Sequence, residues 1–223
     1  MTETERIRRI YDDHAATHHR SLGIVERLLL GRFRYAFGAL LVGETIEVGV
    51  GSGLSIPFYS PAVTRAVGVD LSHEMLRHAH ERASHLGIPF GFVQADAEAL
   101  PFPDAAFDTV AISLALCTIP DPVKALRELA RVCRPDGRIV MLEHVRSTAR
   151  PLAALQSVLS PLNERAIGCH LDRDTIDLAR SLGFSIDEIQ SRLFNSVQLV
   201  LACPPASAVL PSTDPIDAGG SNE

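Results

Sequence analysis

Short runs of β-branched and aliphatic residues alternate along this 223-residue chain with longer segments whose apolar residues recur every three or four positions. The first kind of run is typical of buried strands, and the second kind of segment is typical of amphipathic helices. The predicted strands are residues 45–50, 65–70, 90–94, 107–114, 138–145, 184–193 and 196–203. The predicted helices are residues 3–20, 21–41, 54–59, 72–86, 121–133, 150–159 and 172–182. Strand–helix alternation that ends in a hairpin predicts an α/β fold, with a seven-stranded, mostly parallel sheet, one antiparallel strand and helices on both faces.

A turn with three alternating glycines follows the first predicted strand, and Glu47 lies near the end of that strand. The glycines are Gly49, Gly51 and Gly53. A dinucleotide-binding turn would have its third glycine three residues after the second, at Leu54, so the spacing does not fit that class. The carboxylate of Glu47 would also suit an ammonium group better than a pyrophosphate. The pattern E-x-G-x-G-x-G resembles the first motif of class I S-adenosylmethionine-dependent methyltransferases, whose cofactor carries an amino acid and a sulfonium.

Two further acids end the next two predicted strands. Asp70 is placed to accept hydrogen bonds from both ribose hydroxyls of an adenosine, although it could instead cap the helix that follows. Asp96 and the backbone amide of Ala97 would match the donor and acceptor on the edge of adenine. The alternative for Asp96 is a turn aspartate before Glu98.

Longer segments carry the same resemblance. Residues 95–110, with their Leu-Pro-Phe turn, and residues 129–139 resemble the ubiquinone/menaquinone-biosynthesis-like class I methyltransferases. Residues 114–119, 141–145 and 168–175 resemble a subgroup that contains bacterial phospholipid N-methyltransferases and animal methyltransferase-like alkyl-thiol methyltransferases. The resemblance implies a Rossmann-like class I methyltransferase fold and S-adenosyl-L-methionine as the cofactor.

This resemblance also implies a cofactor site at the carboxyl ends of the first strands. The methionine part would lie near Glu47 and Ser113, the ribose near Asp70, and adenine near Met75 and Asp96. The residues expected to bind the cofactor are Tyr11, Glu47, Gly49, Gly51, Ser52, Gly53, Asp70, Leu71, Met75, Asp96, Ala97, Ser113 and Leu114.

His144 and His170 are the candidates for a catalytic base, because histidine titrates near neutral pH. His144 follows the central sheet, and His170 lies in the segment expected to cover the pocket. The alternatives are that His144 bonds to Glu143 or to the backbone, that His170 only packs in its loop, and that a thiol or neutral amine acceptor needs no base. Four histidines on one predicted helix indicate a solvated face, so no metal site is expected. They are His73, His78, His80 and His85.

Composition narrows the class of protein. The chain is 46% hydrophobic and 22% charged, which is ordinary for a globular protein, and its formal net charge of -6 argues against a general nucleic-acid binder. Four widely spaced cysteines without a C-x-x-C pair indicate buried free thiols in a reducing compartment; Cys117 could line the pocket. Neither a signal pattern nor a membrane-spanning apolar run is visible, so we expect a cytoplasmic protein.

The expected organisation is an N-terminal helical cap at residues 1–42, a methyltransferase domain at 43–203 and a disordered tail at 204–223. Within the domain, residues 146–172 would form a roof over the substrate. Arginines alternate with bulky apolar residues at 32–37, which could lie on a membrane surface as a peripheral contact or pack on the sheet.

The cap and roof segments are expected to present apolar side chains to the acceptor: Leu22, Phe33, Phe37, Leu152, Leu155 and Leu159. The predicted function is methyl transfer to an N, S or O nucleophile of a small apolar or amphipathic molecule, such as a lipid amine, a thiol or a secondary metabolite. The alternative is a cofactor-binding regulatory or partner protein without transferase activity. The pattern does not predict an oligomeric state.

Overall fold

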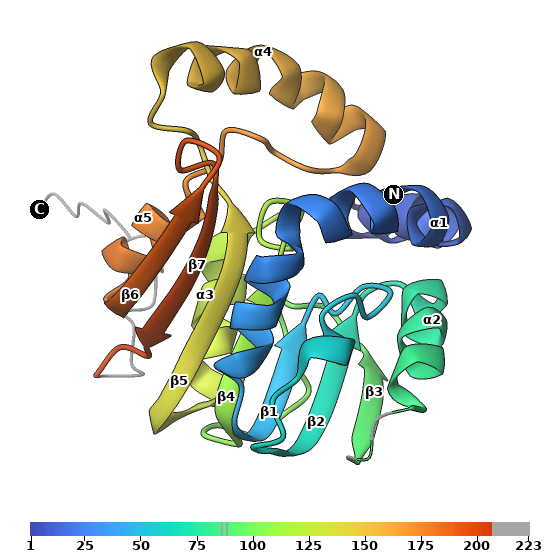
Figure 1. Ribbon diagram of the computed structural model, residues 1–223, viewed down its shortest axis with the longest axis vertical. Coiled ribbons are helices and arrows are strands. Elements are labelled where there is room, and N and C mark those ends of the chain that lie inside the picture. Colours follow the sequence, from blue (N-terminus) through green and yellow to red (C-terminus); the bar gives the residue numbers. More distant parts are fainter. Residues whose placement is uncertain (86, 88, 207–223) are drawn as a thin grey trace, which may run out of the picture.

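The computed structural model describes residues 1–85, 87 and 89–206, and their side chains except at residues 14 and 16–29. Its sheet contains all seven predicted strands, in the order β3-β2-β1-β4-β5-β7-β6 (Figure 1). The strands are β1 (Gly43–Val48), β2 (Val63–Asp70), β3 (Phe90–Gln94), β4 (Phe107–Ser113), β5 (Cys133–His144), β6 (Ser185–Arg192) and β7 (Val197–Cys203). Among these strands, β7 runs opposite to the other six: it pairs antiparallel with β5 and β6, and the remaining pairs are parallel. The predicted fold class is therefore confirmed.

The helices agree with the prediction in place but differ in extent. They are α1 (Glu3–Ala39), the short η1 (Ile56–Phe58), α2 (His73–Ala83), α3 (Pro122–Val132), α4 (Arg150–Ile167) and α5 (Thr175–Ser181). The predicted break at residue 21 was wrong, because α1 is one helix. A capping box at Thr2 and Glu5 begins it, and each of its internal glycines costs only about 1 kcal/mol.

Two other boundaries moved. Helix α4 was expected to end at residue 159, but it continues through Pro161 and ends at Gly168, whose φ of 74° forms a left-handed cap. Strand β5 begins earlier than residue 138, because Cys133 already pairs with Phe107 before a shift in register. Residues 207–223 of the predicted tail lie outside the described residues.

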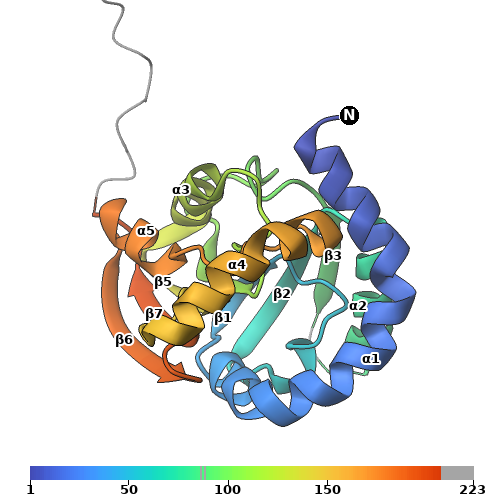
Figure 2. The same ribbon diagram turned by 90° about the horizontal axis from the view of Figure 1, so that it is seen from above.

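Helices cover both faces of the sheet. On one face, Leu126 and Leu129 of α3 and Ile176 of α5 belong to the main hydrophobic core. On the other face, Phe33 and Phe37 of α1 are buried against the sheet. Phe33 and Phe37 therefore pack on the sheet, as one of the two alternatives expected, whereas Tyr35 is exposed and a membrane contact of the segment stays a prediction. Figure 2 shows α1 curving around the sheet, so that its first turns return above the carboxyl ends of the strands.

Helix α4 lies above these carboxyl ends, and polar contacts hold it there (Figures 1 and 2). Gln156 accepts from the backbone N–H of Ser147 at 2.8 Å, and the Ser160 hydroxyl lies 2.6 Å from Asp172. The outer face carries an exposed apolar stripe, called the α4 stripe below, in which the side chain of Val158 is 71% exposed. The α4 stripe consists of Leu155, Val158, Leu159 and Leu162.

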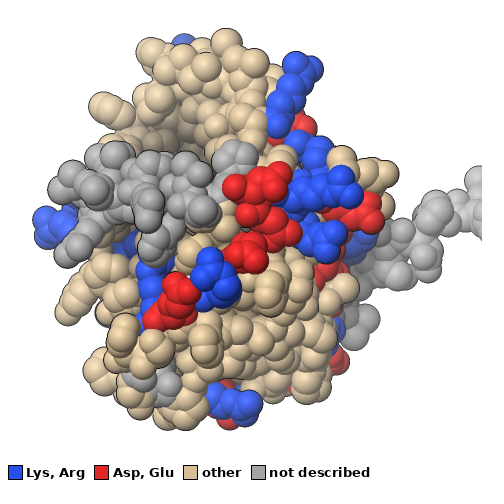
Figure 3. Space-filling view, turned by 90° about the vertical axis from the view of Figure 1, so that its right-hand side faces the viewer, with Lys and Arg blue, Asp and Glu red and all other residues tan. Residues whose placement is uncertain are grey.

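The α4 stripe contradicts the prediction that Leu155 and Leu159 face the acceptor. In the side view of Figure 3, the upper part of the molecule over α4 is largely uncharged, whereas charges of both signs gather lower down. Among the described residues, none of the helices combines the length and the apolar character that crossing a membrane requires.

Candidate functional site

A cavity of about 350 Å³ opens at the carboxyl ends of the strands, beneath α4 and the first turns of α1. This volume is within the range of about 300–1,000 Å³ that small-molecule sites occupy. Most of the predicted site residues line it: Tyr11, Glu47, Gly49, Gly51, Ser52, Asp70, Leu71, Met75, Asp96, Ala97, Ser113, Leu114 and His144. Gly53 and His170 are the two predicted residues that the structure does not bring to the cavity wall. Of the six side chains expected to face the acceptor, the five that are described do not line it either, and that of Leu22 lies outside the described part.

Glu47 is buried at the end of β1, with 1% of its surface exposed. The Tyr59 hydroxyl donates to its Oε2 at 2.5 Å. Burial raises the pKa of Glu47 to about 7, against the opposing effects of Tyr59, the Arg34 guanidinium and Ser55. Near neutral pH this carboxyl group is therefore poised to ionise when a cation approaches.

Arg34 brings a buried cation to the same end of the cavity. It comes from α1, and its Nη1 donates to the hydroxyls of Ser55 at 2.7 Å and Ser113 at 3.4 Å. The sequence prediction missed Arg34 and Tyr59, because neither is near Glu47 in the chain. The available signal was the position of Arg34 within the apolar 32–37 segment, which packs on the sheet.

The glycine turn after β1 has two functions in the structure. Gly49 and Gly51 have φ angles of 67° and 55°, and a side chain at Gly49 would collide with Ala115. The φ angle of Gly53 is 80°, and a Cβ atom there would lie 3.0 Å from the Cα of Ala79 in α2. The third glycine thus permits close packing of the turn on α2 and does not face the cavity.

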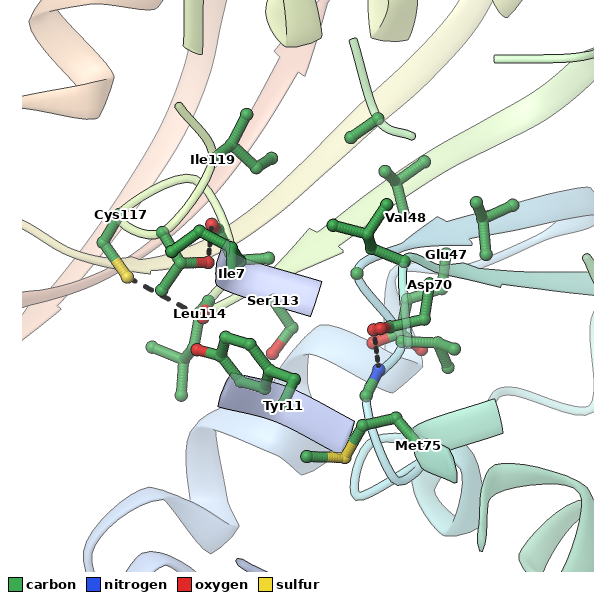
Figure 4. Close-up of a pocket in the computed structure, with 18 of the residues that line it drawn as sticks. Ile7, Tyr11, Glu47, Val48, Asp70, Met75, Ser113, Leu114, Cys117 and Ile119 are labelled. Carbon is green, nitrogen blue, oxygen red and sulfur yellow. Dashed lines mark hydrogen bonds between the residues drawn. The ribbon is translucent and has the colours of Figure 1, made fainter. Parts of the chain in front are cut away.

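Asp70 organises the neighbouring strand end. It accepts from the backbone N–H groups of Gly51 at 2.8 Å and Ser72 at 2.9 Å, so it ties two loops together (Figure 4). Ser72 itself caps α2 by accepting from Met75 at 3.2 Å, so the alternative of Asp70 as the helix cap was wrong. Burial raises the pKa of Asp70 to about 6. Each carboxylate oxygen keeps a lone pair for a ligand in the cavity.

Asp96 combines the two arrangements considered from the sequence. Its Oδ1 accepts from the backbone N–H of Glu98 at 2.9 Å, which is the turn alternative. Asp96 also lines the cavity together with Ala97. The turn bond uses one oxygen, and it holds the carboxylate in place at the cavity wall.

The loop after β4 forms the opposite wall, where Figure 4 shows Cys117 across the cavity from Asp70. Leu114 adopts the left-handed conformation, with φ of 54°. Glu143, which is fully buried on β5, accepts from the backbone N–H groups of Ala115 at 3.0 Å and Leu116 at 3.1 Å. The sequence analysis did not predict these hydrogen bonds of Glu143, although a glutamate within an apolar strand indicates a buried polar role.

The two histidines have different surroundings. His144 lines the cavity, and burial lowers the pKa of its ring, so it is neutral at pH 7. The alternative of a bond to Glu143 was wrong: within the described part of the chain, His144 Nδ1 is buried without a side-chain partner. The alternative of a backbone contact is supported, because a contact with the backbone of His144 itself opposes the lowering of its pKa. His170 Nδ1 lies 3.9 Å from Glu164, and its backbone N–H donates to the carbonyl of Cys117 at 2.9 Å.

Comparison with known proteins agrees with this arrangement. A family model described as a methyltransferase domain matches residues 46–141. Phosphatidylethanolamine N-methyltransferase from Cereibacter sphaeroides is 42% identical over 132 residues, which are 58% of this chain and 64% of that protein. A ubiquinone/menaquinone biosynthesis C-methyltransferase from Bdellovibrio bacteriovorus is 40% identical over 108 residues, or 48% of this chain and 46% of that protein. The chain thus matches less than two thirds of the length of these relatives.

A solved structure extends the likeness over nearly the whole chain. Geranyl diphosphate C-methyltransferase from Streptomyces coelicolor, in complex with Mg²⁺, geranyl diphosphate and S-adenosyl-L-homocysteine, superposes with a TM-score of 0.69. The two chains are 15% identical, and the match covers 92% of this chain and 98% of that one, which shows a common fold. Residues 46–141 therefore match a methyltransferase domain, and the chain as a whole has the fold of the class I S-adenosylmethionine-dependent methyltransferases.

Proposed function

We propose that this protein transfers the methyl group of S-adenosylmethionine to an N, S or O nucleophile of a small apolar or amphipathic acceptor. The observation that carries the proposal is a single cavity with two acids at one end, buried Glu47 and partly exposed Asp70, and an apolar wall at the other. The sulfonium makes the methyl carbon electrophilic. The protein must therefore hold the acceptor in line with it and exclude water.

The cofactor would lie along the acidic end. Glu47 would accept from the ammonium group of the methionine part, and Arg34 would pair with its carboxylate. Asp70 would accept from the ribose hydroxyls. Adenine would pack on Met75, with its edge towards Asp96.

This placement predicts that S-adenosylmethionine binds more tightly as the pH rises. The pKa values of Glu47 (about 7) and Asp70 (about 6) lie above their ordinary values of 4.5 and 3.8, so both acids are largely protonated at pH 5. The cationic cofactor favours their ionised forms, so binding releases protons. We expect the affinity to rise roughly 100-fold between pH 5 and 8.

Titration calorimetry in two buffers with different ionisation enthalpies measures both the affinity and the protons released. Glu47→Gln is the matched variant, and its affinity should vary much less with pH. An unchanged affinity across this range, without proton release, would exclude the placement of the cofactor beside Glu47.

The acceptor would occupy the other end of the cavity, where Ile7, Ile119 and Ile167 contribute apolar surface. Helix α4 lies above the carboxyl ends of the strands (Figure 1), and its exposed α4 stripe supports a peripheral contact with a lipid surface, from which an amphipathic acceptor would enter. The four free cysteines support a reducing, cytoplasmic setting. For an acceptor that is protonated, neutral His144 is the candidate base at the cavity wall.

The test uses S-adenosylmethionine with a labelled methyl group and three presentations of acceptor. These are phosphatidylethanolamine in vesicles, the same headgroup on a short-chain monomeric lipid, and a panel of alkyl thiols and phenols. We expect label in at least one class of product. If the acceptor is the lipid amine, Val158→Asp in the α4 stripe should slow the reaction with vesicles and leave the reaction with monomeric lipid unchanged.

Cofactor binding without product from any class would contradict methyl transfer to small molecules. That result would favour the alternative of a cofactor-binding regulatory or partner protein. Equal rates for Val158→Asp and the wild type on vesicles would contradict the lipid contact at α4 while leaving the transferase proposal in place.

A further inference from the structure

Two cysteines and one histidine from distant parts of the chain meet at the apolar end of the cavity. Cys117 lies in the loop after β4, His144 is the last residue of β5, and Cys169 follows the cap of α4. One ligand atom from each residue lies within 4.8 Å of the other two. All three residues line the cavity.

The cysteines are held in place by their backbones. The carbonyl of Cys117 accepts from the backbone N–H of His170 at 2.9 Å, and the carbonyl of Cys169 accepts from the side chain of Asn163 at 2.8 Å. Their Sγ atoms are 3.2 Å apart, and both residues are buried, with 1% and 5% of their surface exposed. Hydrogen bonds to the backbone of each cysteine therefore hold the two loops that bring the thiols together.

We propose that Cys117, Cys169 and His144 form a binding site for a soft divalent transition-metal ion of the zinc type, with its fourth coordination position open towards the cavity. The proposal concerns the metal site alone; in the metal-loaded protein His144 is a ligand, so it could act as the base proposed above only in the metal-free protein. Sulfur and imidazole ligands in this combination select zinc-like ions, and three protein ligands with one open position characterise reactive zinc sites.

The distances allow such an ion with a small adjustment. Zinc lies about 2.3 Å from sulfur and about 2.0 Å from nitrogen, so a tetrahedral site separates two thiolate sulfurs by about 3.8 Å. The Sγ atoms would have to move apart by roughly half an ångström. A disulfide would require the opposite movement, to about 2.05 Å, and would leave His144 unexplained.

The polar surroundings also fit an ion. His144 Nδ1 is buried without a side-chain partner among the described residues, as expected for a ring whose partner is not a protein side chain. Binding would release the two thiol protons to solvent, and the two thiolates would neutralise the divalent cation. Arg173 donates to the carbonyls of Leu116 and Ile119 at 2.7 Å, so it holds the loop that carries Cys117.

Cobalt is the spectroscopic probe for the test. Reduced, metal-free full-length protein is titrated with Co²⁺. We expect one ion per chain, with a thiolate-to-cobalt charge-transfer band and the visible bands of a tetrahedral site, and displacement by Zn²⁺. Cys117→Ser and Cys169→Ser should each weaken binding about 100-fold and reduce the charge-transfer band. His144→Gln should keep that band and weaken the tetrahedral visible bands.

Cys133→Ser and Cys203→Ser are matched controls, because one thiol is buried and the other is half-buried, and neither lines the cavity. Both should bind cobalt as the wild type does. Native mass spectrometry of the unmutated protein with Zn²⁺ gives a second readout that does not depend on the folding of any variant. The proposal is overturned if the wild type binds neither ion, or if the charge-transfer band survives in a Cys117→Ser, Cys169→Ser double variant.

Discussion

Replacing Asp70 by asparagine is expected to weaken the binding of S-adenosylmethionine about 100-fold, because at least two hydrogen bonds to a charged acceptor are lost. Asp70 accepts from Gly51 and Ser72 and, in the proposed function, also from the ribose. Asparagine has a single acceptor oxygen. Its amide nitrogen would face a backbone N–H as a second donor, so the substitution also disturbs the glycine turn on which the cofactor lies.

Asp108→Asn is the matched control for this experiment. Asp108 likewise accepts a backbone hydrogen bond, from Glu44 at 2.8 Å, and it pairs with Arg134 near the opposite end of the sheet. Its loss should lower the thermal stability and leave the affinity for the cofactor unchanged. Calorimetry on both variants, with circular dichroism to verify folding, measures the two effects. An Asp70→Asn affinity within about threefold of the wild type would show that Asp70 does not bind the ribose, because one charged hydrogen bond alone is worth more.

The strands and their positions along the chain were predictable because each is a short apolar run bounded by a turn. The acids at the strand ends were predictable for a related reason: in a parallel sheet, the carboxyl ends of the strands meet at one edge. Glu47, Asp70 and Asp96 therefore needed only local pattern and the direction of the strands to be brought together.

The partners of these acids were not predictable in this way. Arg34 reaches Ser55 and Ser113 because the stretch of α1 around Phe33 and Phe37 packs on the sheet. Tyr59 meets Glu47 through the turn of η1. Such contacts depend on tertiary packing, and no spacing in the chain encodes them.

The α4 stripe shows a different limit. Apolar residues repeat there with helical spacing, which correctly indicates that they share one face. The repeat does not say what covers that face. The inner side of α4 is joined to the protein by Gln156 and Ser160, which are polar, and this fixes the apolar side outward.

Replacing Glu143 by alanine is expected to lower the free energy of unfolding by about 3 kcal/mol, because two buried backbone N–H groups lose their acceptor and a cavity remains. These groups belong to Ala115 and Leu116, so the loop that carries Cys117 would lose its attachment to β5. Chemical denaturation at pH 7 measures the loss. A decrease below about 1 kcal/mol would mean that the loop is held by other contacts.

The Glu143→Gln variant should behave differently, and its effect should depend on pH. Burial raises the pKa of Glu143 to about 7, above the ordinary value of 4.5, so the folded protein binds more protons than the unfolded chain between these values. The wild type therefore loses stability from this group as the pH rises from 4.5 to 7, by up to about 3 kcal/mol. The glutamine side chain still accepts from both N–H groups and cannot ionise. The free energy of unfolding of the variant should therefore rise relative to that of the wild type between pH 5 and 8.

Glu128→Gln is the control, because the pKa of Glu128 is shifted in the opposite direction to that of Glu143. Glu128 accepts from the backbone N–H of Leu100 at 2.7 Å, but its hydrogen bond with Arg131 lowers its pKa. Its contribution to stability is complete above the ordinary pKa and declines only in more acidic solution. The difference between Glu128→Gln and the wild type should therefore stay constant between pH 5 and 8. If the Glu143→Gln difference is equally constant, Glu143 is not a carboxyl group whose burial opposes its charge.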